Sequence, residues 1–234
     1  RMVANRYGTT HHELKLEADQ YAALLSDLIW QNDLPLNFAN SVQIFAISKL
    51  AKNHVTVVLT GEGADELFGG YPRYYIPKLL QPIERLPKRL TAALLSLTKL
   101  INDHRVQKLR DYAAQTTEDM LLYNPVASDH RQIPPRFAGI WPEHFDYREN
   151  IIQQGQRAKL DPVTNLALLD QQTFLVSILN RQDKMSMAAS VEARVPFLDN
   201  QVLEFAHTLP IHFKQTVRHR KRILKAVARR YLPD

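Results

Sequence analysis

Three carboxylates and four glycines are crowded into the stretch VVLTGEGADELFGGYPRY, which occupies positions 57–74. The acids Glu62, Asp65 and Glu66 are spaced so that they share about one helical turn. If two of them lay half-buried about 5 Å apart, their charges would repel by ~3 kcal/mol at an effective dielectric of about 20, and a divalent cation would cancel that repulsion. Mg²⁺ prefers carboxylate oxygens and bridges them to phosphates. The pattern therefore predicts a magnesium and nucleotide site.

A helix N-terminus is the alternative interpretation of the same acids. An exposed carboxylate in the first turn of a helix gains ~0.3–1 kcal/mol from the helix dipole without any ligand. Gly69 would then end a short helix as its C-terminal cap. Residue types alone leave both interpretations open, because two glycines separated by one residue are a weak nucleotide signal.

A strand must precede the acids if they are to lie at a ligand site. Residues 55–60, VTVVLT, are β-branched and almost entirely apolar, which predicts a parallel strand buried on both faces. Ligands of open α/β sheets lie at the carboxyl ends of the strands, and this strand ends at Thr60. Gly61 and Gly63 would let the backbone turn there and approach a ligand. The helix expected at 64–68 would point free N–H groups to the same place, which favours an anion.

The rest of the chain is predicted to be mainly helical. Apolar residues recur at helical spacing in several stretches, whereas alternation at 12–16 predicts a short strand. The further helices are expected to begin near Asp19, Val42, Asn165 and Asn200. Asp199 can cap the last of them. Residues 76–150 are expected to form a variable helical region without a chemical motif. Strands alternating with helices indicate an α/β fold.

Composition narrows the class of protein. The 234 residues include 45% hydrophobic and 23% charged residues, an ordinary globular balance. The sequence contains no run of about 18 apolar residues, so no membrane span is predicted. Residues 1–13 lack the apolar core of a secretory signal. The absence of Cys excludes disulfides and thiol nucleophiles and fits a reducing cytoplasm. Much of the excess positive charge lies at 214–230, where a basic amphipathic helix is expected.

The stretch GEGADELFGGYPRY closely resembles a motif of the synthetase domain of the glutamine-hydrolysing asparagine synthetase family. Three further blocks agree with that family in order and rough spacing. They are Gly8–Glu13, Arg181–Asp199 and Lys221–Pro233. The resemblance covers about 1–75 and 160–234. It implies an ATP-pyrophosphatase-type α/β fold with a parallel sheet and a large helical portion.

The resemblance also implies roles for individual residues. Thr60, Gly61 and Glu62 would border the adenine nucleotide, and Glu62 would position or deprotonate the attacking ammonia. Asp65 would be a Mg²⁺ ligand near pyrophosphate, and Lys184 would steady pyrophosphate and the transition state. These roles agree with the chemistry, since adenylation gathers negative charge on phosphates and a carboxylate near an amine can accept its proton. Without the family, Lys184 would be interpreted as a solvated lysine at a helix end.

Three smaller features receive structural interpretations. Glu192 and Arg194 are expected to form an ion pair that supports the site. Gly69 and Gly70 are expected to end a helix rather than to cradle a phosphate. The run His11-His12-Glu13 is not expected to bind zinc, because neighbouring strand residues point to opposite faces.

By resemblance, the whole enzyme would convert aspartate to asparagine through an aspartyl-adenylate attacked by ammonia. It would use ATP and Mg²⁺ and would take ammonia from a glutaminase domain. The resemblance is also compatible with a homodimer. The family's pyrophosphate loop, Ser-Gly-Gly-x-Asp-Ser, does not occur in the sequence. We therefore expect residues 1–234 to be a synthetase domain without its N-terminal strands, that loop and the glutaminase domain, and to be inactive alone.

Three other interpretations stay open. Enzymes with the same motifs amidate other carboxylates, close β-lactam rings or cyclise peptides, although Glu62 favours ammonia as the nucleophile. The basic residues 214–230 could bind nucleic acid through salt-dependent phosphate contacts, but few aromatics are available there for base stacking. A non-catalytic scaffold is the third interpretation, and the acidic cluster argues against it because a scaffold would not need one.

Overall fold

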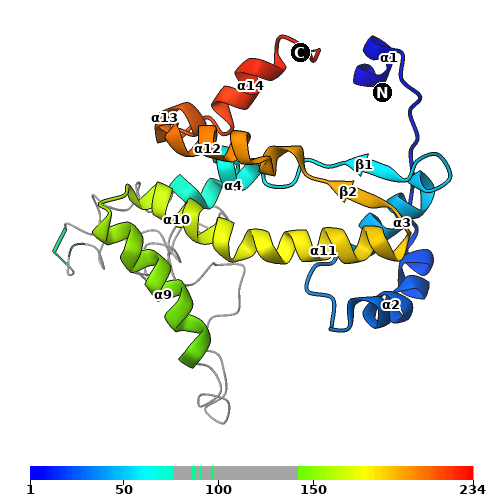
Figure 1. The fold of residues 1–234 in the computed structure, drawn as a ribbon, viewed down its shortest axis with the longest axis horizontal. Coiled ribbons are helices and arrows are strands. Elements are labelled where there is room, and N and C mark those ends of the chain that lie inside the picture. The colour runs from blue at the N-terminus through cyan, green and yellow to red at the C-terminus, as the bar shows by residue number, and fades with distance from the viewer. Residues whose placement is uncertain (76–85, 88–89, 91–95, 97–141, 234) are drawn as a thin grey trace.

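The computed structural model describes residues 1–75, 86–87, 90, 96 and 142–233. Helices dominate this part of the chain (Figure 1). The α-helices are α1 (Met2–Tyr7), α2 (Ala18–Asn32), α3 (Ser41–Ala51), α4 (Ala64–Phe68), α9 (Pro142–Arg157), α10 (Pro162–Gln172), α11 (Phe174–Ala188), α12 (Asn200–Thr208), α13 (Ile211–Lys214) and α14 (Arg222–Ala228). The strands and short 3-10 helices are β1 (Val57–Leu59), β2 (Glu192–Arg194), η1 (Pro72–Tyr75) and η5 (Pro196–Leu198).

The two strands form a small parallel sheet in which Val58 is paired with Ala193. Helices lie between them in sequence, so the described chain is α/β, as predicted. The prediction of a strand buried on both faces is wrong. Val57 and Leu59 are 37% and 72% exposed, and only Val58 between them is partly buried. Because strand side chains alternate between faces, one face of the sheet is packed and the other is open.

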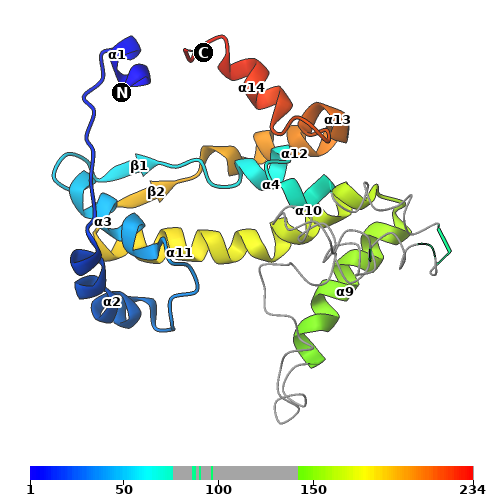
Figure 2. The same cartoon turned by 180° about the vertical axis from the view of Figure 1, so that it is seen from behind.

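Helix α11 is the central element of the described structure. It runs alongside the strand pair and joins the α2–α3 end of the molecule to the α4–α10 end, as Figures 1 and 2 show from opposite sides. Thr173 separates it from α10, with φ −128° and ψ −71°. The apolar periodicity starting at Asn165 is therefore divided between two helices, with Leu169 buried on the first and Ile178 on the second.

Three apolar clusters hold these elements together. One joins η1, α9 and α10 around Tyr74 and Leu169. A second joins α2, α3 and α11 through Leu28, Val42 and Met185. The third joins α4, η5, α12 and α14. The second cluster thus anchors α11 against α2 and α3, and the third anchors α4 against α12 and α14.

Other predictions have mixed outcomes. Residues 12–16 do not form a strand, because the structure gives them no pairing partner; they lead instead to a capping box between Glu17 and Gln20 at the start of α2. The cap of α12 is confirmed, since the Asp199 carboxylate accepts from the N–H of Gln201 at 2.9 Å. Most of the predicted region 76–150 lies outside the described residues. Within the described part, no helix has the length and apolarity to cross a membrane.

The basic stretch is only partly helical. The predicted amphipathic helix at 214–230 is limited to α14, and Ile223 and Leu224 pack its apolar side against the cluster of Leu67 and Phe68. Tyr231, which lies beyond the end of α14, is 59% exposed. The non-helical residues before α14 bring the positive charges close to α4.

Candidate active site

The candidate site lies where the two parallel strands end. Beyond β1, the N–H of Thr60 donates to the carbonyl oxygen of Arg194 at the end of β2, 2.8 Å away. The loop then turns at Gly63, whose φ of +86° lies in the left-handed region. A Cβ there would lie 2.4 Å from Cδ2 of Leu198, so only glycine fits. The predicted glycine turn is confirmed, and it brings α4 to the carboxyl end of the sheet.

The three acids of this loop and helix do not gather in one place. Glu62 Oε1 accepts from Arg181 at 2.8 Å, Asp65 Oδ1 lies 2.9 Å from Lys221 Nζ, and Glu66 Oε1 accepts from Tyr71 at 2.7 Å. Within the described residues, no group of three His, Cys, Asp or Glu side chains could hold a metal ion. Each of the three carboxyl groups thus has its own partner, which is an arginine for Glu62, a lysine for Asp65 and a tyrosine for Glu66. Asp65 can serve at most as one ligand of a site completed by other groups.

Glu62 is held by a mostly buried arginine. The Arg181 side chain is 10% exposed and the Glu62 side chain 27%. Arg181 also donates to Oδ1 of Asn40 at 3.1 Å, and its guanidinium lies over the ring of Phe38, 4.8 Å from the centroid. These contacts come from α11 and from the segment before α3, so the position of Glu62 is tied to two helices as well as to the strand. Arg181 begins the second of the sequence blocks described above, but its pairing could not be read from the sequence.

Lys184 lies one turn beyond Arg181 on α11 and faces a polar cavity. Its ammonium donates to the carbonyl oxygen of Asn32 at 2.5 Å and lies 3.4 Å from the carboxylate of Asp33. The cavity has a volume of about 110 Å³. Its polar walls, besides these residues, are Asn37, Ser41, Ser177 and Asn180. Lys184 therefore contacts the α2–α3 loop, and the cation that pairs with Asp65 is a different lysine.

That lysine is Lys221, which the sequence prediction missed. Its backbone has φ +51° at the start of α14, an uncommon conformation for a residue other than glycine. A Cβ on Gly70 would lie 1.5 Å from Oδ1 of Asp65 and 2.6 Å from Cε of Lys221, so this glycine makes room for both charged groups. Arg220 donates to the carbonyl oxygen of Gly70 at 3.4 Å and adds a second contact between the two loops. Lys221 is the first residue of the block Lys221–Pro233, and the resemblance of that block to the family was the signal that could have identified it.

Thr60 and Gly61 have an environment that a nucleotide could occupy. The hydroxyl oxygen of Thr60 is buried and has no hydrogen-bond partner within the described residues. Beside Gly61 the structure is open, since a Cβ built there would meet no atom within 4 Å. The Asp65 side chain is 38% exposed and offers hard oxygen atoms, the ligand type that Mg²⁺ takes. The chemistry of these groups fits a magnesium-bound phosphate, with Asp65 as one ligand among others.

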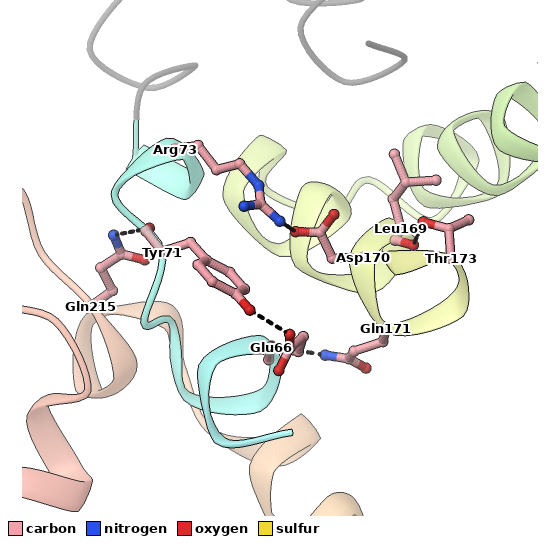
Figure 3. A network of polar contacts seen from close by, with 8 residues as sticks. All are labelled: Glu66, Tyr71, Arg73, Leu169, Asp170, Gln171, Thr173 and Gln215. Carbon is pink, nitrogen blue, oxygen red and sulfur yellow. Dashed lines mark hydrogen bonds and ion pairs between the residues drawn. The ribbon is translucent and has the colours of Figure 1, made fainter. Parts of the chain in front are cut away.

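A buried polar network stands behind α4 (Figure 3). Glu66 is 2% exposed, and burial raises the pKa of its carboxyl above the ordinary value of 4.5, although the hydrogen bond from Tyr71 opposes the shift. Burial, and then this hydrogen bond, raise the pKa of Tyr71 as well. Gln171 on α10 donates to the carbonyl oxygen of Glu66 at 3.1 Å, and Gln215 donates to that of Tyr71 at 3.1 Å. The network fixes α4 between α10 and the segment that leads to Lys221.

The second half of the network joins η1 to α10. Arg73 donates to Asp170 at 2.5 Å, and their side chains are 13% and 2% exposed. Burial raises the pKa of the Asp170 carboxyl, and the charge of Arg73 opposes that shift. The guanidinium of Arg73 also lies 4.2 Å from the ring centroid of Tyr71 and 5.0 Å from that of Phe174. This ion pair is a supporting contact between η1 and α10.

The ion pair expected between Glu192 and Arg194 and the helix end expected at Gly69 are confirmed. Glu192 and Arg194 form an ion pair of 2.7 Å on β2, with both side chains more than half exposed. Gly69 ends α4 with φ +69°, so it terminates the helix as expected. His12, in turn, stacks on His54 with ring centroids 4.1 Å apart.

Comparison with known proteins identifies the family. The family model described as Asparagine synthase matches residues 1–234. The chain belongs to the Asparagine synthase family. Its resemblance to that family, inferred from four short blocks, is thereby confirmed for the whole chain, including residues 76–159, where no motif was found.

Individual relatives of this Asparagine synthase chain are longer proteins. A protein of Mycobacterium tuberculosis with the provisional name asparagine synthetase (glutamine-hydrolysing) is 35% identical over 218 residues, which are 91% of this chain and 33% of that protein. Asparagine synthetase (glutamine-hydrolysing) 1 of Bacillus subtilis is 30% identical, over 94% of this chain and 35% of its own length. Amidase chyE of Penicillium rubens is 24% identical, over 92% and 35%. The chain thus spans about a third of the length of these relatives.

Proposed function

We propose that this chain is the synthetase part of an enzyme that converts aspartate to asparagine with ATP. The observation that carries the proposal is the position of Glu62 at the end of β1. On one side of Glu62, Arg181 leads to a polar cavity; further along α4, Asp65 and Lys221 form a charged pair. Such an arrangement separates a carboxylate-binding side from a phosphate-binding side. The open α/β sheet of the ATP-pyrophosphatase type is part of the same proposal.

The phosphate side consists of Asp65, Lys221 and the loop at Thr60 and Gly61. Attack of the aspartate side-chain carboxylate on the α-phosphorus of ATP forms the aspartyl-adenylate and releases pyrophosphate. Negative charge gathers on the leaving phosphates, and the ammonium of Lys221 would stabilise it. Bound Mg²⁺, held in part by Asp65, would neutralise phosphate charge. The unpaired hydroxyl of Thr60 would donate to the nucleotide.

The acceptor side is the cavity along α11. Its volume of about 110 Å³ suits a small polar molecule, and Arg181 and Lys184 give it two cations. A cation is the partner that an α-carboxylate requires. We therefore assign Lys184 to binding of the acceptor rather than to pyrophosphate, which revises the role expected from the sequence. Its contact with Asn32 would keep the ammonium at the cavity wall.

Glu62 lies between the two sides and would act on ammonia. Its carboxylate can accept a proton from the ammonia that attacks the acyl-adenylate, so that the amide forms and AMP leaves. The ion pair with Arg181 would keep the Glu62 carboxylate correctly oriented. In the whole enzyme, ammonia would come from a glutaminase domain. A cytoplasmic location would agree with the lack of Cys in this sequence.

The test is ATP–pyrophosphate exchange by the full-length protein. We expect exchange to require both aspartate and Mg²⁺, and asparagine to form when ammonia or glutamine is added. Exchange with another carboxylate but not with aspartate would instead support an amidotransferase or cyclase of the same fold, an alternative to which the similarity to amidase chyE gives some weight. Absence of exchange with every carboxylate tried would refute the adenylation chemistry.

A further inference from the structure

A second cavity, separate from the candidate active site, lies among α4, α10, α12 and α13. Its volume is about 190 Å³, below the roughly 300–1,000 Å³ of sites for drug-sized ligands. Leu67 of α4 lines it, whereas Asp65, Glu62 and Lys221 do not. The four helices lie close together in both views of the molecule (Figures 1 and 2). A ligand in this cavity would therefore be a small molecule that does not occupy the nucleotide or acceptor positions.

The wall of the cavity carries a cation, Lys214, to which no described residue supplies a counter-ion. No hydrogen bond or ion pair joins the ammonium of Lys214 to another residue of the described chain. Burial lowers the pKa of Lys214, and burial together with the charge of Lys214 lowers the pKa of His207, so the two groups are near each other. Partly burying an ammonium without a counter-ion is unfavourable. A bound anion would remove that penalty.

The acid in the cavity wall is already engaged. Glu66 accepts from Tyr71, and Lys214 does not contribute to the shift in its pKa. Gln171 is also fixed, because its amide nitrogen donates to the carbonyl oxygen of Glu66 and its amide oxygen lies 2.9 Å from Nε2 of His207. Since that amide oxygen can only accept, Nε2 of His207 carries the proton. Hydrogen bonds thus hold Glu66, Gln171 and His207 in place before any ligand binds.

Much of the remaining wall of the cavity is apolar. Leu67, Leu168 and Ile211 line it, and Leu67 is 1% exposed. A bare inorganic anion would leave these side chains without contacts, whereas an aliphatic tail would pack against them. A wall that combines a cation with apolar side chains selects an amphipathic anion.

We propose that this cavity binds a small aliphatic carboxylate, with its anionic group at Lys214 and its hydrocarbon tail among Leu67, Leu168 and Ile211. The inference does not depend on the function proposed above, because none of these residues is assigned there. Binding would add an acceptor for the Lys214 ammonium and would cover the apolar wall. The ligand would contact the residues of α4 adjacent to Asp65.

Isothermal titration of the full-length protein with isovalerate tests the proposal. We expect saturable binding that weakens roughly 10-fold or more in K214M, because the charge-assisted hydrogen bond is lost. The matched control K225M, at an exposed lysine of α14, should bind as the wild type does. Isovaleramide, which has the same shape without the charge, should bind at least roughly 10-fold more weakly than isovalerate.

A second variant protects the test against misfolding. A167L fills the cavity and keeps Lys214, so it should abolish isovalerate binding while circular dichroism shows an unchanged fold. Equal affinity of wild type and K214M, or no saturable binding to the wild type, would overturn the proposal. Tighter binding of inorganic phosphate than of isovalerate would also overturn it, since the apolar wall would then contribute nothing.

Discussion

Glu62 is the single residue on which the proposed amide-forming step depends. In E62Q the side chain keeps its size and can still accept from Arg181, but it no longer takes a proton from ammonia. We expect asparagine formation to fall by roughly 10²–10⁴-fold, the usual contribution of a positioned general base. Aspartate-dependent ATP–pyrophosphate exchange should fall far less, because ammonia takes no part in adenylation. Rapid-quench measurement of AMP and asparagine separates the two steps.

The control for this prediction is E204Q. Glu204 is an exposed residue of α12, and the same change there should leave both steps unaltered. If E62Q lowered exchange and amide formation by the same factor, Glu62 would be needed for adenylation itself, and its assignment to ammonia would be wrong.

Lys221 carries the second prediction at the level of single residues. K221M keeps a chain of similar length and removes the charge beside Asp65. A hydrogen bond to a charged group contributes about 1.5–3 kcal/mol, so affinity for pyrophosphate should drop roughly 10–100-fold. Affinity for AMP, which lacks the leaving phosphates, should change little. Competition binding with a fluorescent ATP analogue measures both values, and an equal loss for AMP would show that Lys221 acts only by holding the loop in place.

Among the structural elements, η1 depends most on one ion pair. Removing Arg73 in R73M would leave the buried carboxylate of Asp170 without its partner. Breaking such a pair from one side costs about 3–5 kcal/mol. Urea denaturation followed by tyrosine fluorescence should therefore show a large loss for R73M. R157M, at the exposed end of α9, should stay within about 0.5 kcal/mol of the wild type; similar values for the two variants would contradict the structural role of the pair.

At this scale the sequence predicts elements better than their boundaries and contacts. The short helix after the glycine turn and the cap at Asp199 follow from local residue chemistry, whereas the partner strand of β1 at Glu192–Arg194 was not predicted. The strand expected at 12–16 does not form, because alternation produces a strand only where a neighbour completes the hydrogen bonds. The pairs Glu62–Arg181 and Asp65–Lys221 join residues more than a hundred positions apart, and no spacing rule reveals them.

For the molecule as a whole, the buried acid Glu66 makes folding depend on pH. Burial raises the pKa of its carboxyl in the folded state above the ordinary value of 4.5. The folded state therefore holds the proton more tightly than the unfolded state does, so the contribution of Glu66 to stability is present at acidic pH and is lost as pH rises through the folded pKa. E66Q, whose amide oxygen can still accept from Tyr71, removes this dependence.

The prediction concerns how the free energy of unfolding changes with pH in E66Q and in the wild type. The free energy of unfolding of E66Q relative to the wild type should increase as pH rises from about 4 toward about 7. Denaturant titrations at several pH values measure it, and E204Q supplies the comparison for an exposed glutamate. A difference that stays constant with pH would mean that Glu66 titrates alike in the folded and unfolded states.

The overall architecture was predictable only in outline. Motif resemblance indicated the family, which the match over 1–234 confirms, but it did not indicate the pairs Glu62–Arg181 and Asp65–Lys221. The interpretation of Lys184 shows why. The family resemblance implied a role at pyrophosphate, which stays a prediction, and no motif could indicate that the packing of α11 against α3 places the Lys184 ammonium beside the α2–α3 loop.

The left-handed backbone of Lys221 creates a conflict between the proposed binding of pyrophosphate and thermal stability. A non-glycine residue in that conformation costs on the order of 1 kcal/mol, whereas its ion pair, partly open to water, returns about 0–1 kcal/mol. K221G should therefore melt at a higher temperature than K221A, and about as high as the wild type. Laboratory evolution that selects only for heat resistance would accept glycine at this position and would lose the charge that we propose binds pyrophosphate.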